Sequence, residues 1–275
     1  MIVNLLQIFI LVFTIIISVG FMKKRGSSVV MFYFAFGLVC MLLANLYWLA
    51  CEIIDPEIMD PYNINEIGEM GSFLLFASLL NVVFKDKKVN VVPDIILTLI
   101  FTVVVTALWI AWSDEWIKNI TGSFYFGYMM CVTVVAVKKT GVLKKVETML
   151  LWTTVFAILC VQILIFYVEE PAAGILDTIA YVLIFSLLAY LLGRALLQVG
   201  LALKGGSIET SEKAVALSFF SFIWSQNAMY MSNEPLFSVA AVTGAVILVL
   251  ALSAVISYEK AKAGKGALLR KEGTA

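Results

Sequence analysis

The chain of 275 residues contains no histidine. Histidine is the usual general base near neutral pH and the commonest metal ligand of proteins. Its absence excludes histidine-dependent intramembrane metalloproteases, Ser-His hydrolases and electron carriers with a histidine-ligated haem. The four cysteines also lack the CxxC spacing of metal and redox sites, and all fall in or at the end of apolar runs. They are typical of small hydrophobic residues in helix packing.

Nucleotide and hydrolase motifs are equally absent. The sequence has no Walker phosphate loop, no GxGxxG, no GxSxG and no HExxH. These patterns indicate nucleotide binding, ester hydrolysis or zinc-dependent proteolysis, so we expect no cofactor and no nucleic-acid partner. An enzyme without histidine would have to use Asp or Glu chemistry. No carboxylate pair at helical spacing lies deep enough in an apolar run to favour that class.

Charged residues make up only 14% of the chain, whereas hydrophobic residues make up 62% and the mean hydropathy is +1.01. Soluble domains are about half apolar, and a membrane helix needs about 20 apolar residues to cross a hydrocarbon core of about 30 Å. The apolar runs therefore predict an all-α, polytopic membrane bundle over residues 1–258, followed by a basic cytoplasmic tail over residues 259–275. About nine transmembrane helices are expected, at about 2–21, 29–51, 63–84, 91–112, 120–137, 146–168, 172–197, 214–232 and 236–258.

Basic residues are confined to alternate connections between these spans. Eighteen of the 19 Lys and Arg residues lie in every second connection or in the tail, and only Lys118 lies on the other side. Connections rich in Lys and Arg stay in the cytoplasm because their translocation is disfavoured. The pattern predicts a multi-pass protein of the plasma membrane with its N-terminus outside and its C-terminus in the cytoplasm. Acidic residues gather on the outer side, either as a cation-attracting surface or because Lys and Arg are excluded there.

The segment 214–232 is the least hydrophobic of the nine, because Ser225, Gln226 and Asn227 lie within it. If it did not cross the membrane, the basic residues of the tail would lie outside and the alternation would fail. The charge pattern therefore favours nine spans over eight.

Polar side chains inside a bilayer are costly, so each one is a candidate for function. Here they gather in the outer halves of the expected spans. Asp177 lies about two turns inside its span, and Tyr181 follows one turn later on the same face. This pair could bind a cation or an amine. The alternative is that Asp177 is a first-turn carboxylate stabilised by the helix dipole.

A second candidate group lies on the second and third spans. Glu66 and Glu69 are three residues apart and share a helical face, so they could bind a divalent cation together with oxygen ligands from another helix. Ordinary acids in the first turn of a helix are the alternative. Asn45 and Glu52 could meet this pair across a short connection, although an Asn in a membrane helix often only joins neighbouring helices.

The eighth span carries the remaining candidates, Gln226, Asn227 and Tyr230. They follow a stripe of serines on the same helix, formed by Ser218, Ser221 and Ser225. Such a helix either faces a substrate or packs closely against its neighbours, because small residues allow helices to approach. The sequence leaves both alternatives open.

The number of spans favours a small-solute or cation transporter, a permease with an outward-facing acidic and polar vestibule. The alternative is a membrane receptor or sensory subunit that binds an extracellular small ligand and signals through a partner. The expected partners are the lipid bilayer, a small cationic or polar ligand and a cytoplasmic protein at the Lys-rich inner face.

Overall fold

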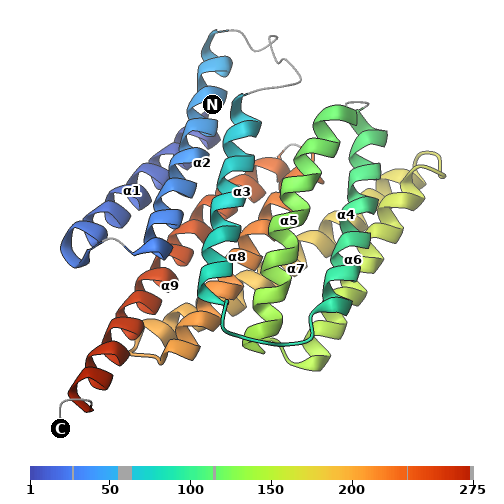
Figure 1. Ribbon diagram of the computed structural model, residues 1–275. Coiled ribbons are helices and arrows are strands. Elements are labelled where there is room, and N and C mark those ends of the chain that lie inside the picture. Colours follow the sequence, from blue (N-terminus) through green and yellow to red (C-terminus); the bar gives the residue numbers. More distant parts are fainter. Residues whose placement is uncertain (27, 55–63, 114–115, 234, 273–275) are drawn as a thin grey trace.

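The computed structural model describes residues 1–26, 28–54, 64–113, 116–233 and 235–272. Within these residues all regular structure is helical, and the nine helices run up and down through one bundle (Figure 1). They are α1 (Ile2–Arg25), α2 (Val29–Ile54), α3 (Ile64–Val83), α4 (Val92–Ser113), α5 (Trp116–Thr140), α6 (Lys145–Ile165), α7 (Ala172–Leu203), α8 (Ile208–Tyr230) and α9 (Leu236–Glu272).

Eight of the nine helices in the described residues are long and apolar enough to cross a membrane by their own composition. This confirms the expected class, a multi-pass helical membrane bundle. Successive helices alternate in direction (Figure 1), so the Lys-rich connections fall at one end of the bundle, which we call the basic end. The opposite end, where Glu66 and Glu69 begin α3, is called the acidic end. The distribution of Lys and Arg assigns the basic end to the cytoplasm.

Helix α8 is the exception in composition because it lies inside the bundle. It packs against α3, α5, α7 and α9, and every residue from Ala214 to Met229 is buried. A helix with no face toward lipid does not need lipid-like hydropathy. The low hydropathy of this segment therefore reflects a central position rather than a failure to cross.

Two contacts with the α3 region place the ends of α8 at opposite ends of the bundle. Near its start, Glu212 lies 2.5 Å from the Nζ of Lys87, just after α3. At its end, the Tyr230 hydroxyl donates to Glu69 in the first turns of α3. The 18 residues from 212 to 230 span about 27 Å at 1.5 Å per residue, close to the hydrocarbon thickness of about 30 Å.

Several helices extend beyond the apolar runs that predicted them. Helix α8 begins six residues earlier than expected, because Ser207 caps it by accepting a hydrogen bond from the Thr210 amide at 3.2 Å. Lys213 and Glu209 add an ion pair one turn apart, at 2.6 Å. Helix α9 continues without interruption to Glu272, so the predicted tail begins as an extension of the last membrane helix.

Four phenylalanine rings form a buried layer in the middle of the bundle. Phe34 of α2, Phe76 of α3 and Phe219 and Phe222 of α8 are all fully buried. The Phe76 ring centroid lies 5.2 Å from that of Phe219, 5.6 Å from that of Phe222 and 5.9 Å from that of Phe34. We call these four residues the aromatic layer. It lies about two turns inward from Glu69 along α3.

Near the basic end, ion pairs tie the helices together. The Nη1 of Arg194 on α7 lies 2.7 Å from Glu147 on α6, and its Nη2 donates to the Val142 carbonyl at 2.9 Å. Arg194 therefore joins α7 to α6. Together with the pair of Lys87 and Glu212, this contact holds the cytoplasmic ends of four segments in place.

Candidate functional site

A cavity of about 800 Å³ lies at the acidic end, between α1, α2, α3, α4, α5, α8 and α9. We call it the first cavity. Its size is within the range of small-molecule sites, about 300–1,000 Å³. Six of the sequence-predicted residues line it, and they come from α2, α3 and α8: Asn45, Glu52, Glu66, Glu69, Gln226 and Tyr230. The structure therefore joins the candidates of three helices in one site.

The three carboxylates of the first cavity differ in their partners. Glu66 lies 2.9 Å from the Nζ of Lys118, and Glu52 lies 2.9 Å from the amino nitrogen of Met1. Glu69 accepts a hydrogen bond from the Tyr230 hydroxyl, but no Lys or Arg of the described residues lies within ion-pair distance of it. Because Glu66 and Glu69 share one face of α3, the carboxylate of Glu69 is presented to the cavity beside an already neutralised neighbour.

Two buried amides also line the first cavity. Asn4 of α1 is 4% exposed, and neither atom of its amide has a hydrogen-bond partner in the described part of the chain. Gln226 of α8 is 2% exposed, and its Oε1 is likewise unpaired among those residues. A buried polar group without a partner costs about 1–3 kcal/mol. Both amides are therefore placed to pair with the polar atoms of a solute in the cavity.

Gly244 of α9 lies against the polar turn of α8. A Cβ at Gly244 would lie 2.9 Å from Gln226 Nε2 and 2.8 Å from Ser225 Oγ, so a larger residue there would displace these side chains. The glycine thus leaves room for the amide that lines the cavity.

Aromatic rings form the walls of the first cavity. The Trp109 ring lies 5.3 Å from that of Tyr230 and 5.5 Å from that of Phe126. Trp109 is only 8% exposed and lines the cavity. Phe73 lines the inner side, and its ring centroid lies 6.3 Å from that of Phe222 in the aromatic layer. The aromatic layer therefore lies between this cavity and the basic end.

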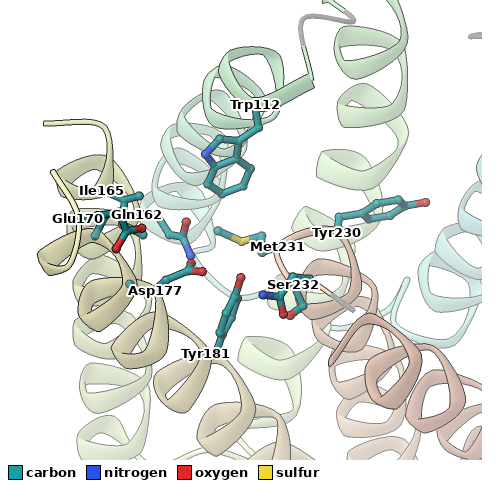
Figure 2. Close-up of a pocket in the computed structure, with 12 residues that line it drawn as sticks. Trp112, Gln162, Ile165, Glu170, Asp177, Tyr181, Tyr230, Met231 and Ser232 are labelled. Atoms are coloured by element: carbon teal, nitrogen blue, oxygen red, sulfur yellow. The ribbon is translucent and has the colours of Figure 1, made fainter. Parts of the chain in front are cut away.

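A second cavity, of about 370 Å³, lies between α6, α7 and the residues that follow α8. In Figure 2 the Asp177 carboxylate, the Gln162 amide and the Tyr181 hydroxyl point toward a common space, whereas the Tyr230 hydroxyl points away from it. Asp177 and Tyr181 therefore belong to a different site from Glu66 and Glu69. The candidates divide between two cavities, and Trp112 and Tyr230 line both.

Asn227 and the serine stripe contribute to neither cavity. Asn227 is fully buried, and the side chains of Ser218, Ser221 and Ser225 are buried as well. These positions do not line the first or the second cavity. The stripe is therefore enclosed among the helices that pack against α8, and its contact with a substrate stays a prediction.

The sequence also held signals that the predicted site did not use. Asn4 and Gln7 lie one turn apart in the first apolar run, and Gln7 donates to the Ala241 carbonyl of α9 at 3.1 Å. Two amides at helical spacing in such a run already indicate a face that does not contact lipid. Gln162 is a comparable case on α6: it is 1% exposed and faces Asp177.

The described residues contain no group of three or more His, Cys, Asp or Glu side chains that could hold a metal ion. The fold and the cavities define the class, a multi-pass helical membrane protein with two solute-sized cavities toward its acidic end. Comparison with protein-family models, curated proteins and solved structures finds no match. The function must therefore be inferred from the geometry of the two cavities.

Proposed function

We propose that the protein is a plasma-membrane transporter for organic cations, with the first cavity as its outward-facing substrate site. The observation that carries this proposal is the Glu69 carboxylate, which lines the first cavity together with the unpaired amide of Asn4 and the unpaired Oε1 of Gln226. A carboxylate binds an ammonium group strongly when water is largely excluded. The rings of Trp109 and Tyr230 add cation–π attraction and apolar contact.

The aromatic layer supports transport by alternating access. Substrate in the first cavity has to pass the plane of Phe76, Phe219 and Phe222 to reach the cytoplasm, and these rings are fully buried. Helices α3 and α8 carry three of the four rings of the layer and also the pair of Glu69 and Tyr230. A shift of α8 against α3 would therefore open the layer and change the cavity together, as the gating of one helix group against another requires.

Uptake into proteoliposomes tests the proposal. The probes are radiolabelled tryptamine and tryptophol, which share the indole ring and differ in carrying an ammonium or a hydroxyl group. Charged hydrogen bonds contribute about 1.5–3 kcal/mol, so Glu69→Gln should lower tryptamine uptake about 10- to 100-fold. The matched control is Glu209→Gln, because Glu209 is exposed at the basic end and should leave uptake unchanged. Equal uptake of the two probes would contradict a cation site.

A receptor that signals through a cytoplasmic partner is the second candidate, and the closed aromatic layer is the observation that favours it. Such a protein would bind tryptamine in detergent with the same dependence on Glu69, but would not accumulate it in proteoliposomes. Binding without uptake therefore refutes the transporter and supports the receptor. The Lys-rich connections at the basic end would then be the surface to search for a partner.

A further inference from the structure

The lining of the second cavity is acidic, which favours a cation site separate from the first cavity. Asp177 of α7 and Glu170, just before α7, line it, and no Lys or Arg is among its lining residues. Its volume of about 370 Å³ is less than half that of the first cavity. A small ligand with positive charge is therefore the favoured occupant.

Two polar side chains that line the second cavity with Asp177 lack a hydrogen-bond partner, which an acceptor atom of a ligand could supply. Gln162 is 1% exposed, and its Nε2 donor has no hydrogen-bond partner among the described residues. The Oγ of Ser232, on the other side of the cavity, is unpaired in the same set. In Figure 2 the Gln162 amide nitrogen and the Asp177 carboxylate lie next to each other in the view, and the Tyr181 hydroxyl points toward them. A bare metal ion offers nothing to an N–H donor, whereas an oxygen atom of a ligand does.

The two cavities do not share their recognition groups. Tyr230 turns its hydroxyl toward Glu69 and away from Asp177, so its ring lies between the two sites. Neither Asp177 nor Gln162 lines the first cavity, and neither Glu69 nor Asn4 lines the second. A ligand of the second cavity is thus selected independently of the first.

From these contacts we propose that the second cavity binds a small ammonium compound that also carries an oxygen acceptor, the chemistry of an amino alcohol. The ammonium group pairs with the Asp177 carboxylate. The oxygen, two carbons away, accepts from Gln162 Nε2. This site is additional to the proposed substrate site and does not depend on transport.

Thermal unfolding of the detergent-purified full chain in amine-free phosphate buffer tests the proposal. The probes are ethanolamine, ethylammonium, which lacks the oxygen, and sodium chloride, which supplies only a cation. Ethanolamine should raise the unfolding midpoint in a saturable way and bind the wild-type chain about fivefold more tightly than ethylammonium, the value of one hydrogen bond. This comparison needs no variant, so it stands even where a substitution prevents folding.

The variants then assign the site. Asp177→Asn should weaken ethanolamine binding at least about tenfold, and Gln162→Leu should remove the preference for ethanolamine over ethylammonium. Glu209→Gln is the matched control: this carboxylate is exposed at the basic end, so the variant should leave ethanolamine binding unchanged. The proposal is overturned by the absence of an ethanolamine effect, by an equal effect of sodium chloride, or by wild-type affinity in Asp177→Asn. An ethanolamine effect that is lost in Glu69→Gln but kept in Asp177→Asn would overturn it as well, and that result would leave the first cavity as the cation site.

Discussion

A tight contact between α2 and α3 gives a prediction whose size follows from the geometry. Gly37 of α2 faces Phe76 of α3, and a Cβ at this glycine would lie 2.4 Å, 2.8 Å and 3.0 Å from Cε1, Cδ1 and Cζ of the ring. Carbon atoms in contact normally lie about 3.5–4.0 Å apart. The ring cannot move aside easily, because Phe219 and Phe222 pack against it from α8. The substitution Gly37→Ala must therefore separate α2 and α3 or displace the aromatic layer.

We expect Gly37→Ala to lower the free energy of unfolding by about 2 kcal/mol. Overpacking costs about 1–3 kcal/mol, and a contact this short lies at the upper end of that range. The higher helix propensity of alanine offsets about 0.8–1 kcal/mol of this cost. The assay is equilibrium denaturation of the detergent-purified protein, followed by tryptophan fluorescence. The matched control is Gly20→Ala on α1, where nothing lies within 4 Å of the added Cβ. The control has no clash, so it should raise the free energy of unfolding by about 0.8–1 kcal/mol, the gain in helix propensity alone.

A double-mutant cycle separates the clash from a general effect of the substitution. Phe76→Leu alone should cost about 1–2 kcal/mol, because it shortens a fully buried ring. Combined with Gly37→Ala, it creates room for the new methyl group, so the double variant should be at least about 1 kcal/mol more stable than the sum of the two single effects. Two results would refute the packing of α2 against α3 described above. One is a double variant whose loss of stability equals the sum of the single losses, and the other is a Gly37→Ala protein as stable as the Gly20→Ala control.

Three further predictions concern other helix contacts. Glu147→Gln should lower the free energy of unfolding by about 1 kcal/mol in the same assay, since Glu147 and Arg194 are partly buried partners at 2.7 Å. Combined with Arg194→Leu, the loss should be smaller than the sum of the two single losses; equality would show that the two residues act separately. A water-soluble carbodiimide should join Lys87 to Glu212 in an amide bond detectable by mass spectrometry, because their atoms lie 2.5 Å apart, and loss of this product in Glu212→Gln is the control; its absence from the wild-type chain would contradict the placement of α8. Trp224→Phe should lower stability by about 1–2 kcal/mol, because the buried indole donates to a carbonyl of α7 at 3.2 Å, and an unchanged midpoint would show that this bond is absent.

The membrane-spanning helices were predictable because their signals are local. Each span requires its own apolar run, and each connection is retained or translocated according to its own Lys and Arg content. The ends of α8 were less predictable, since Ser207 and Glu209 extend the helix through polar residues that an apolar run does not include. The aromatic layer was not predictable at all, because only tertiary packing brings Phe34 of α2 near Phe219 of α8.

The residues of the candidate site could be predicted, but their grouping could not. Polar residues in apolar runs identify faces that avoid lipid, and this signal found Glu69, Asp177 and Tyr230. Which faces meet depends on how the helices are arranged around α8, and a single sequence carries no direct information on that arrangement. Asp177 and Glu69 were both consistent with one vestibule, yet the end of α8 divides the space between them.

The central position of α8 accounts for both the weakest sequence signal and the proposed mechanism. A helix enclosed by four others is sheltered from lipid, so it can carry Gln226 and Asn227 at low hydropathy without leaving the bundle. The same enclosure puts its two phenylalanines in the aromatic layer and Tyr230 at the boundary of both cavities. Because Glu212 fixes its other end to Lys87, a displacement of α8 cannot alter one of these contacts alone. The segment whose crossing was hardest to predict is therefore the one through which binding at the acidic end would reach the cytoplasmic face.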